Sequence, residues 1–384
     1  MDRRKFLAAS GLAAATPVLA YDLQNSQNAD TAPDLFKKIN FTTDGLGLEP
    51  AEYATLLHQT TNHGLEADYY SNGGVVAELE QKFARLLGKQ AAMFVPTGTL
   101  ANHLALRKLA GNDRRVLVQA ESHIYNDSGD CADVLSGLNL IPLATDSSAM
   151  PLAEIKSWVE RSAHGRVPTK VGVISIENPV RRKDHEMLDF AELQQICAYA
   201  REQGIGLHMD GARMFNLPFH SGKSIREYAA LFDTVYLSLW KHFNGASGAM
   251  LVGTAEFIEG LYHTRRMFGG SLPLAWPQIA LVAQYVDGYE ADYAKAWHAA
   301  DQLIALVQSS GLFKVRKLPK GTSRFFLKTT GVASAVLVER LSKQGVVLSQ
   351  AHPDTGEFAI QVNPTILRME PAALARIFID SAKV

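Results

Sequence analysis

The sequence predicts an α/β fold: a large domain built on a mainly parallel sheet of the seven-stranded type, with a small C-terminal α+β domain. Short apolar runs alternate with longer runs of helical spacing through most of the chain. Such alternation implies parallel strands joined by crossover helices that cover both faces of the sheet. From about Phe313 the order changes to strand, helix, strand, helix, which predicts the second domain.

Helices are expected where apolar residues recur every three or four positions. Gly88 and Gly204 each stop such a run. The expected helices of the large domain are Val75–Leu87, Thr99–Leu109, Pro151–Arg161, Phe190–Gln203, Glu256–Arg265 and about 277–308. The expected strands there are Ala91–Val95, Val116–Gln119, Val171–Glu177, Gly206–Met209, Thr234–Ser238 and Ala249–Val252. The C-terminal elements are expected at Phe325–Lys328, Val332–Gln344, Phe358–Val362 and Pro371–Ile379.

The first twenty residues are predicted to be an export signal and not part of the fold. A basic start from Arg3 to Lys5 precedes an apolar run that ends in a plausible cleavage site at Val18-Leu19-Ala20. Residues 3–7 (RRKFL) resemble the twin-arginine signal, which a receptor reads. An ordinary secretion signal or an uncleaved helix is the alternative. We expect a periplasmic protein, or a cytoplasmic one if the signal does not function.

These patterns divide the chain into a signal peptide (1–20), a leader and N-terminal segment (21–60), a large domain (61–310) and a small C-terminal domain (311–384). Hydrophobic residues make up 47% and charged residues 20%, which is typical of a soluble globular protein. A net charge of −1 argues against a basic surface for nucleic acid or anionic membranes. The two cysteines, Cys131 and Cys197, are expected to be buried free thiols.

Two polar clusters follow predicted strands in the first half of the large domain. In residues 96–102 (PTGTLAN), Gly98 allows a close approach of the backbone, and the free N–H groups from Thr99 onward would hold a phosphate. In residues 119–125 (QAESHIY), the His123 imidazole could stack on an aromatic ring and transfer protons. An ordinary helix cap and a surface histidine are the plainer alternatives.

Two further clusters follow later strands. In residues 208–213 (HMDGAR), Asp210 ends an apolar strand, where a carboxylate needs a partner such as a protonated pyridine nitrogen. Arg213 offers a fork for a carboxylate, although a structural Asp–Arg pair is the alternative. In residues 238–248, Lys241 follows a buried strand, and burial would make its amine a usable nucleophile. A solvated turn lysine is the alternative there.

The order of these clusters is the layout of fold-type-I pyridoxal-phosphate (PLP) enzymes, which need a lysine, an acid opposite the ring nitrogen and a phosphate cup. Between about Asp68 and Gly270 the chain closely resembles the threonine aldolase/aromatic amino acid β-eliminating lyase family. Lys241 would then be the Schiff-base lysine, Asp210 would keep the pyridine nitrogen protonated, and His123 would stack on the ring and serve as base. The strongest stretches are FVPTGTLANHLAL (94–106), ESHIYNDSGDCADVLSG (121–137), ENP (177–179), DGARMFN (210–216) and residues 238–253.

The same resemblance implies the remaining roles. Arg213 and Thr43 would contact the substrate carboxylate, Gly98 and Thr99 would bind the cofactor phosphate, and Tyr70 would lie near the active site of a partner subunit. It implies a homodimer or homotetramer, a small amino acid as substrate and no metal.

The implied reaction is cleavage of the Cα–Cβ bond of a β-hydroxy-α-amino acid, such as L-threonine or L-allo-threonine, to glycine and an aldehyde. One alternative is a β-eliminating lyase or another PLP enzyme with a different substrate. A second is a non-catalytic periplasmic binding protein with the PLP fold.

Three positions depart from the family pattern. Pro273 stands where an arginine usually helps to bind the cofactor phosphate, and Trp240 stands where a serine usually precedes the lysine. No arginine occurs in residues 359–363, near the family's late carboxylate-binding arginine, so Arg324 or Arg368 is the candidate to replace it. These departures leave the identity of the substrate open.

Overall fold

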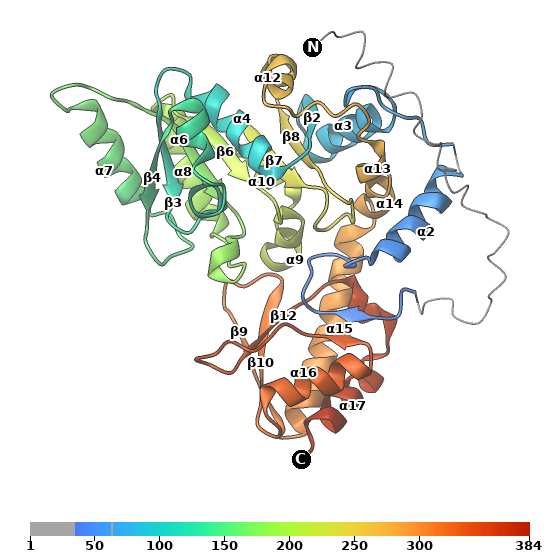
Figure 1. Ribbon diagram of the computed structural model, residues 1–384. Helices are drawn as coiled ribbons and strands as arrows, with labels where there is room; N and C mark the ends of the chain where they lie inside the picture. The colour runs from blue at the N-terminus through green and yellow to red at the C-terminus, as the bar shows by residue number, and fades with distance from the viewer. Residues whose placement is uncertain (1–34, 63) are drawn as a thin grey trace, which may run out of the picture. The chain divides into compact units, whose positions relative to one another are not determined.

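A seven-stranded sheet forms the centre of the part that the computed structural model describes, residues 35–62 and 64–384 (Figure 1). Lys37–Val384 form one compact unit. The predicted signal (1–20) and the polar leader (21–33) lie outside the described residues. The strand order is β2-β8-β7-β6-β5-β3-β4. The strands are β2 (Ala91–Val95), β3 (Arg115–Gln119), β4 (Asn139–Leu143), β5 (Val171–Glu177), β6 (Gly206–Asp210), β7 (Thr234–Ser238) and β8 (Ala249–Gly253).

The sheet is mainly parallel, as predicted. Only β8 runs against its neighbours, pairing antiparallel with both β2 and β7. The pairs β3–β4, β3–β5, β5–β6 and β6–β7 are all parallel. Every residue of β5 and of β7 is buried, which is expected for strands covered on both faces.

Helices cover the two faces through separate apolar clusters. Along β2, Phe94 belongs to the cluster that includes Phe83, whereas Met93 and Val95 belong to the cluster that includes Leu104. Alternate side chains of a strand point to opposite faces of the sheet. The helix α3 (Gly74–Leu87), which contains Phe83, and the helix α4 (Gly98–Ala110), which contains Leu104, therefore cover different faces. The helices of this region are α3 (Gly74–Leu87), α4 (Gly98–Ala110), α5 (His123–Asn126), α6 (Cys131–Ser136), α7 (Leu152–Ala163), α8 (Phe190–Glu202), α9 (Leu217–Ser221), α10 (Ile225–Ala230), α11 (Ala255–Glu259), α12 (Tyr262–Met267), α13 (Trp276–Ile279) and α14 (Val282–Val286), with short 3₁₀ helices at Arg181–Lys183 and Met214–Asn216.

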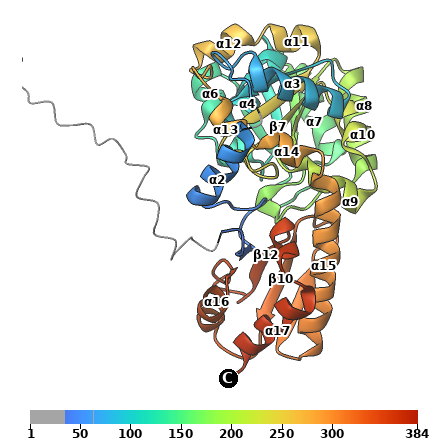
Figure 2. The ribbon, with the colours of Figure 1, turned by 90° about the vertical axis from the view of Figure 1, so that its right-hand side faces the viewer.

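The C-terminal elements form a smaller antiparallel sheet, in the order β12-β10-β9. The long helix α15 (Tyr289–Ser309) runs beside this sheet, as Figure 2 shows. The other elements here are β9 (Phe313–Lys317), β10 (Arg324–Thr329), α16 (Ser334–Lys343), β11 (Val346–Val347), β12 (Phe358–Gln361), a 3₁₀ helix at Pro364–Arg368 and α17 (Pro371–Ala382). Two elements near the start of the described chain complete the fold, β1 (Ile39–Asn40), which pairs with β11, and α2 (Pro50–Thr61).

Two long helices predicted from the sequence are wrong, because each is divided. The span 277–308 contains α13, α14 and α15, and the Tyr53 hydroxyl and the Ala246 N–H donate to the carbonyls of Pro277 and Gln278 (both 2.8 Å). The span 256–265 is divided into α11 and α12 near Gly260. There the Lys108 amine donates to the carbonyl of Phe257 (2.6 Å). Tertiary partners therefore take carbonyls that a continuous helix would use.

Both cysteines are free and buried, as predicted. Burial raises the pKa of the Cys197 thiol to about 12. Within the described residues, no helix combines the length and the apolar character needed to cross a membrane.

Candidate active site

The carboxyl ends of three parallel strands bring the predicted residues together. Glu177 ends β5 and pairs in register with Asp210, which ends β6, and Asp210 pairs with Tyr236 of β7. Lys241 follows the end of β7, and it lines one pocket with His123 and these three residues. Ligands of α/β sheets bind at this edge. The structure thus assembles a lysine, an imidazole and a carboxylate in one pocket.

Lys241 is a buried lysine, with only 9% of its surface exposed. Burial, and then the charge of Arg213, lower the pKa of its amine to about 8. A larger fraction of this amine than of an ordinary lysine is therefore neutral near physiological pH and able to attack a carbonyl carbon. Lys241 is therefore not a solvent-exposed turn lysine, which was the alternative for this position.

Asp210 is held in place by a chain of buried polar side chains. Its Oδ2 accepts a hydrogen bond from the Asn102 amide at 2.7 Å, and its Oδ1 accepts from the Ala212 N–H at 3.1 Å. The Asn102 carbonyl oxygen lies 2.8 Å from Nε2 of His208, whose Nδ1 lies 2.8 Å from the Thr234 hydroxyl. Burial lowers the pKa of His208 to about 4, so the ring is neutral and donates to Asn102 through Nε2–H. This chain fixes the Asp210 carboxylate and leaves it room to accept further hydrogen bonds.

His123 is positioned by a carboxylate that the sequence analysis missed. Its backbone N–H donates to Glu177 at 2.6 Å, and its Nδ1 lies 3.3 Å from the Ser128 hydroxyl. Burial is the main cause that lowers the pKa of His123, so the imidazole is neutral at physiological pH. Burial, and then the nearby Asp210, raise the pKa of Glu177 above its ordinary value. The motif ENP contains Glu177, but nothing local in it indicates this contact.

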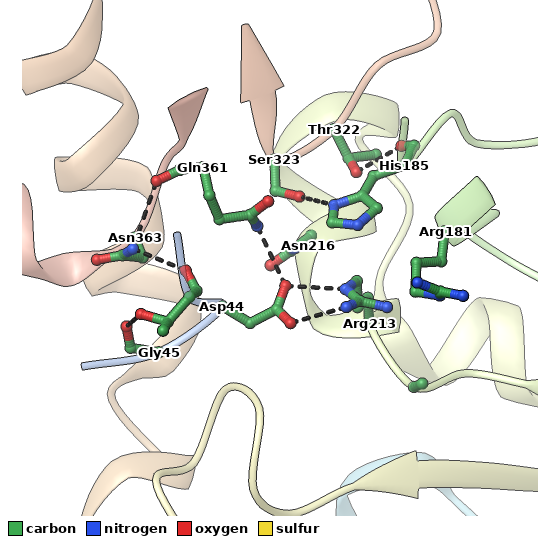
Figure 3. Close-up of polar contacts among 12 residues, drawn as sticks. Asp44, Gly45, Arg181, His185, Arg213, Asn216, Thr322, Ser323, Gln361 and Asn363 are labelled. Carbon is green, nitrogen blue, oxygen red and sulfur yellow. Dashed lines mark hydrogen bonds and ion pairs between the residues drawn. The ribbon is translucent and has the colours of Figure 1, made fainter. Parts of the chain in front are cut away.

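Arg213 binds Asp44 through both arms of its guanidinium. Nε and Nη2 donate to the two carboxylate oxygens, each at 2.8 Å, and both residues are nearly buried. Figure 3 shows the two groups facing each other, with the Gln361 amide approaching Asp44 from another side at 3.1 Å. Burial opposes ionisation, yet the Arg213 guanidinium holds the pKa of Asp44 well below its usual range. A buried Asp–Arg pair does exist, but the partner of Arg213 is Asp44 and not Asp210.

Thr43 and the phosphate turn also lie close to this site. Thr43 lines a cleft with Lys241 and Arg213, and its hydroxyl donates to the Gly45 carbonyl at 3.0 Å. Gly98 begins α4, and a β-carbon there would lie 1.9 Å from the Tyr236 hydroxyl oxygen. Residue 98 must therefore be glycine to leave room for the Tyr236 hydroxyl, whether or not a ligand binds beside it. Within residues 35–62 and 64–384, the backbone N–H groups of Gly98 and Thr99 have no protein acceptor.

Tyr70 does not line this cleft or this pocket in the described chain. Its ring packs under the Arg266 guanidinium, 4.8 Å from the ring centre. Its backbone N–H donates to the carbonyl of Pro273 at 3.0 Å. The role that the resemblance gives Tyr70 involves a second subunit and stays a prediction.

The structure distinguishes the two arginines considered as replacements. Arg324 pairs in register with Gln361 across the small sheet, and its Nε donates to the side-chain oxygen Oε1 of Gln361 at 3.0 Å. The Gln361 side chain therefore connects Arg324 to Asp44, because its amide also donates to the Asp44 carboxylate. Arg368 instead donates to the Lys38 backbone carbonyl at an exposed position. Only Arg324 belongs to the network around Arg213.

The donor set fits pyridoxal phosphate. Lys241 offers an amine of lowered pKa, Asp210 a fixed carboxylate and His123 a neutral ring, all lining one pocket. The start of α4, beside Tyr236 of that pocket, offers unpaired N–H groups of the kind that bind phosphate. Among the described residues, no group of three or more His, Cys, Asp or Glu side chains is arranged to hold a metal ion.

Comparison with known proteins agrees with this chemistry. The Beta-eliminating lyase family matches residues 55–317. The low-specificity L-threonine aldolase of Escherichia coli K12 is 27% identical over 287 residues, 73% of this chain and 83% of that protein. The enzyme of the same name from Eremothecium gossypii is 34% identical over 200 residues, so the match spans about half the length of each chain.

Solved structures share the fold. A putative L-allo-threonine aldolase from Listeria monocytogenes superposes with a TM-score of 0.75 at 29% identity, covering 90% of this chain and 96% of that one. A structure of SPT with PLP superposes with a TM-score of 0.66 at 15% identity, covering 90% and 87%, which shows the fold alone.

Proposed function

Because the chain belongs to the beta-eliminating lyase family, we propose that it is a PLP-dependent aldehyde-lyase of the threonine aldolase type. It cleaves the Cα–Cβ bond of a β-hydroxy-α-amino acid to give glycine and an aldehyde. The observation that carries this proposal is the single pocket shared by Lys241, Asp210 and His123, next to a cleft that Arg213 also lines.

Bound PLP supplies an aldehyde that condenses with amines and a protonated ring that withdraws electrons from the substrate α-carbon. Lys241 would hold the aldehyde, because its lowered pKa makes the neutral amine accessible. Asp210 would face the ring nitrogen, where its fixed carboxylate keeps a proton on that atom. The N–H groups of Gly98 and Thr99 would hold the phosphate.

The substrate side rests on Arg213, Thr43 and His123. Arg213 keeps N–H groups beyond the two that it gives to Asp44, and these would hold the substrate carboxylate and orient the Cα–Cβ bond. Thr43 lines the same cleft and would offer a hydroxyl to that carboxylate. The neutral imidazole of His123 would accept the proton of the substrate β-hydroxyl.

The test is an incubation of PLP-loaded protein with L-threonine and with L-allo-threonine, followed by quantification of glycine and acetaldehyde. We expect equal amounts of both products, and none from a Lys241→Ala variant. If wild-type protein cleaves no β-hydroxy-α-amino acid, the aldolase proposal is wrong. Formation of 2-oxobutanoate and ammonia from these four-carbon substrates instead would identify a β-eliminating lyase. PLP binding without any turnover would identify a binding protein.

Export and assembly complete the proposal. Residues 1–20 direct the folded protein to the periplasm through the twin-arginine route, and the mature protein forms a homodimer or homotetramer in which Tyr70 lies near the active site of the neighbouring subunit. The sequence RRKFL supports the first part, and the resemblance between about Asp68 and Gly270 is the basis of the second. Cell fractionation with N-terminal sequencing tests export, and an uncleaved protein confined to the cytoplasm would contradict it.

A further inference from the structure

An exposed tryptophan lies directly beside the reactive lysine. Trp240 keeps 53% of its surface exposed although it immediately precedes buried Lys241. The Lys241 amine lies 5.4 Å from the centre of the indole ring, and both residues line the same cleft of about 720 Å³. A large exposed aromatic surface at the mouth of a reactive site is typical of a binding surface. Trp240 does not line the polar pocket that contains Asp210 and His123.

The cleft has a charged end and an uncharged wall. Of the described residues that line it, only Asp44, Arg213 and Lys241 carry ionisable charges, and the first two are paired with each other. The wall is contributed by α2 and the turn before it, with Leu48, Pro50, Tyr53, Ala54 and Leu57.

The Tyr53 hydroxyl already donates to the Pro277 carbonyl at 2.8 Å. A substrate side chain that extends away from Lys241 along this wall therefore meets apolar carbon and no unpaired charge. A charged or strongly polar side chain would lose its hydration there without gaining a partner.

The volume of the cleft also exceeds what a methyl group needs. Pockets of about 300–1,000 Å³ enclose molecules larger than a simple amino acid. The methyl side chain of threonine is too small to cover the exposed Trp240 indole, which would gain little contact from it. A planar aromatic side chain can bury the indole by stacking or edge contact.

We propose that Trp240 and the α2 wall form a subsite for an aryl side chain, so that the preferred substrate is a β-hydroxy-α-amino acid with an aromatic group on the β-carbon. This inference rests on the aldolase function proposed above. Trp240 is a specificity-determining residue in this scheme and takes no part in the bond cleavage.

The experiment compares PLP-loaded wild-type protein with Trp240→Ala and Trp240→Phe, using L-phenylserine and L-threonine as substrates. We expect wild-type kcat/KM to favour phenylserine by about tenfold or more. Trp240→Ala should lower kcat/KM for phenylserine by about 5- to 20-fold and change that for threonine by less than about threefold. Trp240→Phe should keep most of the preference, because it keeps an aromatic face.

A binding measurement makes the test independent of turnover. L-Phenylalanine has no β-hydroxyl to support the cleavage, so its Kd can be compared with that of L-alanine by calorimetry. Trp240→Ala should weaken phenylalanine binding and leave alanine binding unchanged. Leu135→Ala is the matched control, since Leu135 is equally exposed at 53%, belongs to α6 and lies outside the cleft.

The outcomes separate this inference from the proposed function. If neither substrate is cleaved, the aldolase proposal is wrong, and the phenylalanine titration alone decides the subsite. If threonine is cleaved while Trp240→Ala alters neither phenylserine turnover nor phenylalanine binding, the subsite is wrong and the aldolase stands. If Trp240→Ala changes only the molecular mass in solution, a second copy of the chain covers the indole and the subsite is again wrong.

Discussion

Burial sets the charge of individual residues in the site, and its effect depends on the partner that each residue finds. Among the described residues no carboxylate is bonded to Lys241, and burial lowers the pKa of its amine. Burial raises the pKa of Glu177, whose neighbour Asp210 is also acidic. Asp44 stays ionised because the Arg213 guanidinium is bonded to both of its oxygens. Similar burial thus gives an amine of lowered pKa in one place and a fixed ion pair in another.

The first prediction concerns the pH dependence of cofactor-free protein at Lys241. The amine has a pKa of about 8 in the folded protein, whereas the ordinary value for lysine, which applies to the unfolded chain, is 10.5. Below about pH 8 both states carry the proton and the folded state bears the full cost of the buried charge. Between these values the unfolded chain holds more protons, so the free energy of unfolding should rise with pH by about 3 kcal/mol relative to Lys241→Met.

Urea unfolding of both proteins across this pH range measures the difference. A difference between wild type and Lys241→Met that stays flat would contradict the lowered pKa. The rate of PLP uptake by wild-type protein should rise over a midpoint near pH 8, in agreement with the same pKa.

At the scale of elements, the turn at the start of α4 follows β2 and lies against Tyr236 of β7. The helix begins at Gly98 directly after β2, and Thr97 caps it by accepting from the Leu100 N–H at 3.2 Å. A side chain at residue 98 would collide with Tyr236 of β7. The turn therefore keeps its free N–H groups at the sheet edge only because residue 98 is glycine.

The second prediction is that Gly98→Ala disturbs this turn. The added β-carbon would lie 1.9 Å and 2.3 Å from the Oη and Cζ atoms of Tyr236, so the turn or the ring must move. We expect a loss of about 1–3 kcal/mol in the free energy of unfolding and about tenfold weaker PLP binding. Urea unfolding and absorbance titration with PLP measure these effects.

Gly288→Ala is the matched control for this substitution. Gly288 precedes α15 with φ of −90°, and the nearest atom to an added β-carbon is an Asp292 oxygen at 3.7 Å. This variant should bind PLP as wild type does and change stability by less than about 1 kcal/mol. If the two alanine variants behave alike, the collision with Tyr236 does not determine the turn.

On the scale of the whole molecule, the substrate end of the site is assembled from three distant parts of the chain. Asp44 comes from the segment between β1 and α2, Arg213 follows β6, and Gln361 ends β12 of the small sheet. Arg324 of β10 holds Gln361 from the neighbouring strand. The orientation of Arg213 thus depends on the small sheet through two side chains.

The third prediction is that Gln361→Ala weakens substrate binding from a distance. Loss of its hydrogen bond to Asp44 should allow the Asp44–Arg213 pair to shift and raise KM by about 2- to 10-fold, with kcat changed by less than about threefold. Steady-state kinetics with the best substrate measure both constants. Lys314→Ala, on the exposed side of β9, is the control and should leave KM unchanged. A fall in kcat alone would contradict a role in carboxylate binding.

Local patterns predict six of the seven strands of the large sheet, but they miss the edge strand β4, whose apolar residues are interrupted by Pro142. The bounds of β2, β5 and β7 match the predicted ones, because each is a short, mainly apolar run rich in β-branched or aromatic residues. Asp210 and Lys241 were recognisable because a polar group at the end of a buried strand is costly without a purpose, and a parallel sheet gathers such ends at one edge. Trp240 departs from the family pattern, but its place on the cleft depends on residues of α2 that lie far away in the chain.

By itself the sequence determined most of the sheet and the reactive groups at its edge, since these depend on neighbours within one strand or turn. Only the tertiary structure decided the division of two helices and the pairing of Arg213 with Asp44 and Gln361. Those features depend on hydrogen bonds between residues far apart in the chain. Such bonds form only after folding brings the partners together, and they leave no periodic pattern in the sequence.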